Sequence, residues 1–94
     1  WFCEHRRLFH AGPDGSVVLR YESSEDFSAV SLDPGGNVLV AVGRRVVQIP
    51  GAGGSPVVLS AGGPDGVTVM VPSPDGSGLW LGTAGEGLWR LSSA

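Results

Sequence analysis

Three residues near the start of this sequence have side chains that could bind a metal ion. Cys3, His5 and His10 offer one thiol and two imidazoles, which are the common ligands of zinc, and Cys3 and His5 would share one face of a strand. Structural zinc sites use two ligand pairs at a fixed spacing, and this sequence contains one cysteine and two histidines. A packed thiol and surface imidazoles are therefore the simpler interpretation.

Other candidate chemistry is equally weak. Glu25 and Asp26 are the residue types of a glycosidase acid pair, but adjacent residues point apart on an extended chain, and these two lie in a Ser-rich turn. Glycine-rich residues 51–54 and 82–85 lead into no helix, so neither segment should cradle a phosphate. No serine lies in a nucleophile elbow. We therefore predict no catalytic residues, no metal ion and no cofactor.

The elements that must position any site recur along the chain. Three segments of the first half return at an offset of 40 to 42 residues: 16–19 as 56–59, 27–31 as 67–71, and 46–49 as 88–91. A tandem period in this range indicates a repeat architecture.

Each period contains four short apolar runs, which have the length of strands and not of helices. Turn-forming sequences separate the runs, with Pro followed by Asp-Gly at residues 12–15, 63–66 and 73–76. The longest interval without Gly or Pro, residues 16–33, is rich in Val, Ser and aromatic residues and is a poor helix sequence. The chain should be all-β.

The third run of each period, at 38–42 and 79–81, is apolar at almost every position. This pattern predicts a strand that is covered on both faces. Four-stranded antiparallel sheets packed face to face have such strands, and a period near forty residues is typical of the blades of a β-propeller.

Two segments resemble the repeats of known propellers. Residues 79–91, preceded by Pro74-Asp75-Gly76, resemble a blade of the two-component-regulator propellers. Residues 30–41 are similar to NHL and gluconolactonase-like propellers, although the Trp-x-Gly-Thr signature of the second period is missing from the first. The first resemblance implies a sensory or binding module, and the second implies a divalent metal held by Glu, Asn and Asp. Asp33 and Asn37 are nearest in kind to such ligands, but they look like turn formers.

The expected organisation is a β-propeller segment of about two and a half four-stranded antiparallel blades. Residues 1–12 match the end of a preceding blade through a shared Arg-Arg pair, 13–51 form the first complete blade, and 52–94 form the second. Because a propeller needs four to eight blades, we expect the C-terminal part of a larger propeller. A ring assembled from copies of the chain is the alternative.

Charge placement predicts a binding surface. Arg6-Arg7 and Arg44-Arg45 should lie in equivalent turns on one rim of the propeller, and acidic residues should emerge on the same side, at Glu22, Glu25 and Asp26. One interpretation is ion pairing in solvent, which contributes little. The other is an arginine-bearing patch for an acidic partner or an upstream domain. The Gly85-Glu86-Gly87 segment replaces the arginine pair in the second period.

Two tryptophans fall at the signature positions of the second period. Trp80 is expected to pack between blades, whereas Trp89, on the outer strand, could instead stack on a sugar ring as exposed tryptophans of lectin propellers do. We therefore include Trp89 among the candidate binding residues.

The function that these patterns favour is a non-enzymatic binding or sensor module, directed at a protein and linked to signalling or effector machinery. A lactonase-type propeller hydrolase and an oligomeric sugar-binding propeller remain as alternatives. The net charge of −3 predicts no nucleic-acid partner, and no apolar stretch is long enough to span a membrane. The partners should be the remaining blades, from the same longer chain or from other copies. The sequence does not define a compartment, although the cytoplasm is weakly favoured.

Overall fold

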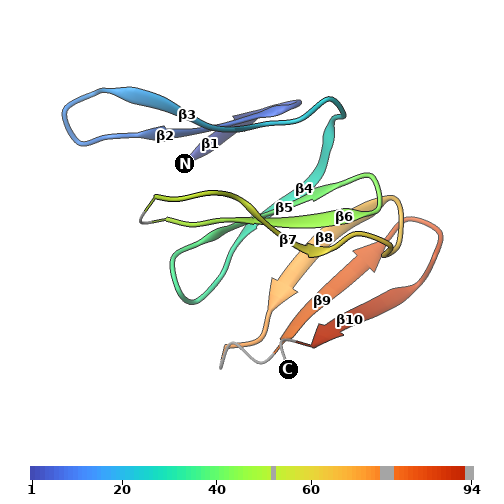
Figure 1. Ribbon diagram of the computed structural model, residues 1–94. Coiled ribbons are helices and arrows are strands. Elements are labelled where there is room, and N and C mark those ends of the chain that lie inside the picture. The colour runs from blue at the N-terminus through green and yellow to red at the C-terminus, as the bar shows by residue number, and fades with distance from the viewer. Residues whose placement is uncertain (52, 75–77, 93–94) are drawn as a thin grey trace.

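The computed structural model describes residues 1–51, 53–74 and 78–92, and this part of the chain folds entirely as strands, turns and loops (Figure 1). The expected all-β class is confirmed. The described residues include no helix that is long and apolar enough to cross a membrane. The ten strands are β1 (Phe2–Glu4), β2 (Arg7–Ala11), β3 (Val17–Glu22), β4 (Phe27–Leu32), β5 (Val38–Val42), β6 (Arg45–Ile49), β7 (Val57–Ser60), β8 (Val67–Pro72), β9 (Gly78–Thr83) and β10 (Leu88–Ser92).

Hydrogen bonds group these strands into three antiparallel sheets. The N-terminal sheet has the order β1-β2-β3, the central sheet β4-β5-β6-β7, and the C-terminal sheet β10-β9-β8. Each hydrogen-bonded pair joins strands that are consecutive in sequence, so every sheet is a meander. Residues 23–26 lead from the first sheet to the second, and residues 61–66 lead from the second to the third.

Two hairpins have a turn of the same length, two residues. Val42 lies opposite Arg45, which leaves Gly43 and Arg44 as a two-residue turn between β5 and β6. Gly43 has a φ of 57°, a conformation that a residue without a Cβ adopts at little cost. In the N-terminal sheet Glu4 lies opposite Arg7 in the same way. The two hairpins therefore place their arginines at equivalent positions.

The three sheets stack face to face, with one apolar layer between each adjacent pair (Figure 1). Alternate residues of a strand point to opposite faces, so β5 contributes to both layers and is buried at all five positions. The expectation that the third run of the first period is covered on both faces is confirmed. The layer beside the N-terminal sheet contains Leu8, Val38, Val40, Val42, Val47 and Ile49. The layer beside the C-terminal sheet contains Leu39, Ala41, Val46, Val67, Met70, Leu79 and Leu81.

The third run of the second period is covered on one face only, which corrects the expectation for this strand. Leu79 and Leu81 of β9 are buried against the central sheet, whereas Trp80 between them is 41% exposed. Trp80 therefore does not pack between sheets as expected. The reason is that no described strand lies against the outer face of the C-terminal sheet.

The sheets also divide the chain at different residues from the expected units 1–12, 13–51 and 52–94. Val17–Glu22 pairs with β2, so the first sheet extends to Glu22, and Val57–Ser60 pairs with β6 in the central sheet. The turn at residues 12–16 closes a hairpin, with a 2.7 Å hydrogen bond from Gly12 N to Ser16 O. A period defines the length of a unit but not the strand at which a sheet begins, and this explains the shift of one strand.

Candidate binding surface at the turn edge

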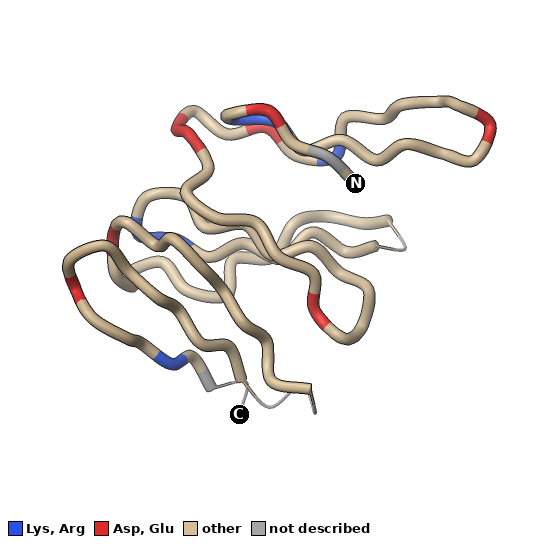
Figure 2. The backbone as a smooth tube through the Cα atoms, turned by 180° about the vertical axis from the view of Figure 1, so that it is seen from behind, with Lys and Arg blue, Asp and Glu red and all other residues tan. Residues whose placement is uncertain are grey.

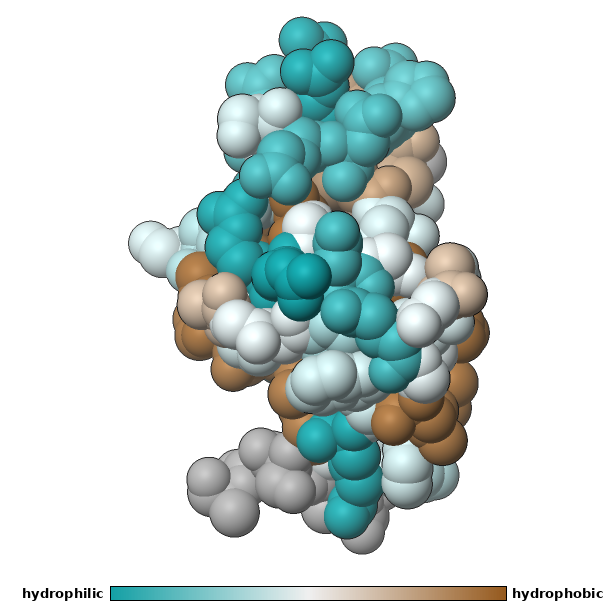
Figure 3. All heavy atoms as spheres, turned by 90° about the vertical axis from the view of Figure 1, so that its right-hand side faces the viewer, coloured by the Kyte–Doolittle hydropathy of each residue, from teal (hydrophilic) through white to brown (hydrophobic). Residues whose placement is uncertain are grey.

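Loops from all three sheets meet at one edge of the stack, which we call the rim. It consists of the turns at residues 5–6, 43–44 and 84–87 and the inter-sheet loops 23–26 and 61–66. Figure 3 looks onto this edge and shows hydrophilic side chains in the middle with hydrophobic side chains on the flanks. Acidic and basic segments are interspersed along the rim in Figure 2. The rim thus carries charges of both signs along one edge of the stack.

Backbone hydrogen bonds fix two of the rim turns. The carbonyl oxygen of Arg6 accepts a hydrogen bond from Ser23 N at 2.8 Å, and that of Arg44 accepts one from Gly63 N at 3.0 Å. Each arginine turn is therefore tied to the loop that leaves its own sheet. These main-chain hydrogen bonds hold the side chains of the two turns in place on the rim.

The two arginines of the first turn are paired with acids of the same sheet or of the loop after it. Arg6 Nε lies 3.1 Å from Asp26 Oδ1, and Arg7 Nε lies 2.7 Å from Glu22 Oε2. The hydrogen bond to Glu22 is the main reason that the pKa of Arg7 is raised. All four side chains are more than half exposed, so these pairs contribute little to the free energy of unfolding.

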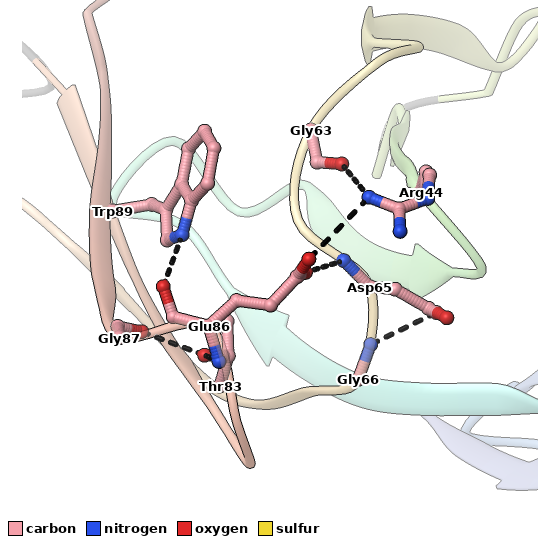
Figure 4. Close-up of polar contacts among 8 residues, drawn as sticks. All are labelled: Arg44, Gly63, Asp65, Gly66, Thr83, Glu86, Gly87 and Trp89. Carbon is pink, nitrogen blue, oxygen red and sulfur yellow. Dashed lines mark hydrogen bonds and ion pairs between the residues drawn. The ribbon is translucent and has the colours of Figure 1, made fainter.

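Arg44 is paired across two sheets (Figure 4). Its Nη1 donates to Gly63 O at 3.3 Å and lies 3.7 Å from Glu86 Oε1, while the other carboxylate oxygen of Glu86 accepts from Asp65 N at 2.6 Å. Glu86 belongs to the turn of the C-terminal sheet that corresponds to the arginine turn of the central sheet. Glu86 stands where the arginine pair would recur in the second period, and it is the acidic partner of Arg44.

Arg45 differs from the other three arginines. It is half-buried at the start of β6, and no ion pair joins its side chain to another described residue. Arg7, at the equivalent position, has Glu22 at the end of the neighbouring strand, whereas Ala61-Gly62-Gly63 follows β7. The loop after β7 therefore supplies Arg45 with no counterpart of Glu22.

Trp89 lies at the flank of the rim and is attached to the same turn as Glu86. Its indole Nε1 donates to Glu86 O at 2.9 Å, and the side chain remains 42% exposed. Thr83 holds the turn closed, because its Oγ1 donates to Gly87 O at 2.7 Å and accepts from Glu86 N at 2.8 Å. Arg44 and Trp89 thus belong to one site, joined through Glu86 (Figure 4). Arg6 and Arg7 form a separate group around the N-terminal sheet.

The residues that could bind a metal ion or act as acids do not gather at one site. Cys3 and His5 are exposed beside the first turn, while His10 is further along β2 and packs against Trp1, with ring centroids 4.6 Å apart. Among the described residues, no group of three His, Cys, Asp or Glu side chains could hold a metal ion. Asp26 is paired with Arg6.

Asp33 and Asn37 lie at the opposite edge and act as turn formers. Asp33 accepts from Asn37 N at 2.9 Å, from Asn37 Nδ2 at 3.1 Å and from Gln48 Nε2 at 2.9 Å. Burial by itself would raise the pKa of Asp33, but these hydrogen bonds together outweigh it, and the pKa lies below its usual value. The carboxylate stabilises the β4–β5 turn in its charged form.

Sequence reasoning missed Glu86, Gly63 and Asp65 as parts of the site. Glu86 carried a usable signal, because it occupies the turn that matches Arg44 in the next period. The two loop residues contribute backbone groups, which carry no sequence signal. Comparisons with protein-family models, with curated proteins and with solved structures find no match for this chain.

Proposed function

We propose that the three sheets are part of a β-propeller and that the chain is a non-enzymatic binding module whose recognition surface is the rim. Consecutive meander sheets that pack face to face, with corresponding turns on one edge, are the arrangement of propeller blades. Repeated units of this kind present chemically different loops on a constant framework, which suits them to binding.

Arg45 is the observation that carries the proposal. Arg45 is half-buried and forms no ion pair with a described residue, so its guanidinium remains available to a carboxylate of a partner. An acidic group from a partner would supply the missing charge and up to two parallel hydrogen bonds. The adjacent Arg44 donates to Gly63 O and has one ion pair, to an exposed glutamate at 3.7 Å, so a partner could share it at small cost.

The partner on this basis is an acidic segment of a protein. The chain carries a net charge of −3, so attraction of an acidic ligand to the whole molecule is not expected. Binding of such a ligand has to depend on the local arrangement at the rim. Binding of an acidic ligand would therefore indicate a specific site at the rim, and not attraction to the net charge of the chain.

A fluorescently labelled hexaglutamate peptide tests the proposal. The peptide should bind the wild-type chain at low ionic strength, and Arg45→Gln should weaken binding by about tenfold, the effect of losing one charge-assisted hydrogen bond. Arg90→Gln removes the same charge from β10, outside the rim, and serves as the control. Equal weakening by both variants, or no binding to the wild type, would refute the rim as the recognition surface.

The propeller proposal also assigns a partner to the C-terminal end of the stack. The outer face of the C-terminal sheet exposes Val69, Val71, Trp80 and Leu88, whose exposed fractions are between 41% and 69%. Apolar sheet faces of this kind are normally covered, and we assign to them the remaining blades of the propeller, from one longer chain or from other copies.

Exposed tryptophans favour a second candidate function, sugar binding. Trp80 and Trp89 are each about two-fifths exposed, and an indole face can stack on a sugar ring. A monosaccharide panel that quenches or shifts tryptophan fluorescence in the wild type, and not in Trp89→Phe, would favour this function over protein binding.

A further inference from the structure

Two turns of this chain have the same four residues but different hydrogen bonds. Gly12-Pro13-Asp14-Gly15 lies in the turn that closes the β2–β3 hairpin, and Gly63-Pro64-Asp65-Gly66 belongs to the inter-sheet loop 61–66 of the rim. Both contain an aspartate followed by glycine. Because glycine has no side chain, its main-chain nitrogen can approach the preceding carboxyl group with little hindrance. A difference in reactivity between two identical tetrapeptides therefore reports on the fold.

In the rim turn, the main-chain N–H of Gly66 points at the carboxylate of the residue before it. Gly66 N donates to Asp65 Oδ1 at 2.9 Å (Figure 4). When this amide loses its proton, the electron pair left on the nitrogen is directed toward the same carboxyl group. Asp65 is also exposed, so water reaches it. The folded turn thus holds the nitrogen and the carboxyl group in an arrangement that favours ring closure.

In the hairpin turn, the corresponding two groups are held by other partners. Gly15 N donates to Gly12 O at 3.1 Å, so its N–H is directed at that carbonyl and not at the carboxylate of Asp14. Asp14 Oδ1 accepts from Ser16 N at 3.0 Å. The Ser16 hydroxyl, and then this main-chain hydrogen bond, lower the pKa of Asp14, which favours the charged and less reactive form of the carboxyl group. Ring closure at Asp14 requires these hydrogen bonds to break.

From this contrast we infer that Asp65-Gly66 is a site of spontaneous aspartate isomerisation in the folded chain, whereas Asp14-Gly15 is protected. Gly66 N forms a bond to Asp65 Cγ and loses its proton, and one carboxyl oxygen leaves as water. Water then opens the cyclic imide at either of its carbonyl groups, which returns aspartate or produces isoaspartate. One water molecule leaves and one enters, so the reaction needs no oxidant or reductant.

The product changes the rim. Isoaspartate adds a methylene group to the main chain between Asp65 and Gly66. In the unmodified turn, Asp65 N donates to Glu86 Oε2 at 2.6 Å, and Gly66 O accepts from Ala84 N at 3.1 Å. Both hydrogen bonds join the loop to the turn of the C-terminal sheet, and the longer main chain alters the spacing between them. Isomerisation should therefore loosen the loop from this turn, whether or not the rim binds a partner.

Incubation of the wild-type chain at neutral pH, folded or in guanidinium chloride, tests the inference. Endoproteinase Asp-N cleaves before aspartate but not before isoaspartate, so the loss of cleavage, followed by mass spectrometry, gives a separate rate at each position. In the folded chain, isoaspartate should accumulate about tenfold faster at Asp65 than at Asp14. In guanidinium chloride, where neither turn is formed, the two rates should be similar.

The variant Ser16→Ala tests the protection of Asp14. It removes the hydroxyl group that holds this carboxylate and should raise the rate at Asp14 in the folded chain. The rate at Asp65, in a different loop, should stay unchanged and serves as the control within the same molecule. An equal rise at both positions would show that the variant loosens the whole chain and that Ser16 has no local protective role.

Three results with the wild-type chain would overturn the inference. The first is an absence of isoaspartate at Asp65, and the second is a rate at Asp14 that equals or exceeds the rate at Asp65 in the folded chain. The third is a preference for Asp65 that persists in guanidinium chloride, because its cause would then be the flanking sequence and not the fold. Both rates come from one sample, so the comparison does not depend on the folding of a variant.

Discussion

The central and C-terminal sheets are built from matching strands, but they differ in how they are covered. Leu39 of β5 and Trp80 of β9 occupy corresponding positions in the two periods, yet Leu39 is 3% exposed and Trp80 is 41% exposed. Leu39 faces the C-terminal sheet, and Trp80 faces outward, where no described sheet follows. An apolar position in this fold is therefore buried by the next sheet in the stack and not by its own sheet.

The largest expected effect separates two adjacent residues of β9. Leu81→Ala removes a fully buried side chain from the layer between the sheets and should lower the free energy of unfolding by about 2–5 kcal/mol. Trp80→Ala, one residue away on the exposed face, should lower it by less than about 1 kcal/mol. Urea unfolding of both variants measures the difference, and equal losses would show that the two faces of β9 are not distinct.

A second prediction concerns the exposed face itself. The wild-type chain should associate with copies of itself as its concentration rises, because the apolar outer face of the C-terminal sheet is uncovered. Trp80→Lys should reduce the association measured by light scattering. Val18→Lys, at a position of similar exposure on β3, controls for the added charge. If both lysine variants reduce the association equally, the outer face of the C-terminal sheet has no special role in self-association.

The edge opposite the rim should respond to acid. The pKa of Asp33 is lower in the folded chain than in the unfolded chain, so its hydrogen bonds stabilise the fold when the carboxylate is charged. This contribution is complete above the unfolded pKa of about 4 and is lost as the pH falls below it, through the lower folded pKa. Asp33→Asn should therefore show a smaller loss of stability between pH 5 and pH 2 than the wild type, in the approximate range where carboxylates titrate. Identical pH profiles would exclude this role.

The smallest expected effect is at the rim. Glu86→Gln removes the exposed ion pair with Arg44 while keeping an oxygen that can accept from Asp65 N, so stability should change by no more than ~1 kcal/mol. Thermal unfolding at low and high salt checks this. A larger, salt-independent loss would mean that Glu86 holds the two sheets together, and not merely their turns.

The strands could be predicted from the sequence because their information is local. The apolar runs and the Gly-Pro-Asp turns specify where strands lie, and the unbroken apolar run at Val38–Val42 also revealed that β5 is covered on both faces. The same reasoning was wrong for Trp80, because apolarity shows that a face can be covered but not that a neighbour is present.

The grouping of strands into sheets and the residues of the site were harder to predict from the sequence. Val17–Glu22 was grouped with the strands that follow it, since a period does not show which turn closes a hairpin and which one crosses to the next sheet. The rim arginines were identified by their spacing, but the partners of Arg44 include the Gly63 carbonyl, which only the fold brings near. Arg45 emerges as distinct only when the residues after β7 are compared with those after β3.

The central claim is that β5 lies between two sheets and contacts each with a different face. Nuclear Overhauser effects between methyl groups test it most directly. The Val40 methyls should show contacts to Leu8 of the N-terminal sheet, and the Ala41 methyl should show contacts to Leu81 of the C-terminal sheet. Contacts from both residues to the same sheet, or from neither to any other sheet, would contradict the stacked arrangement.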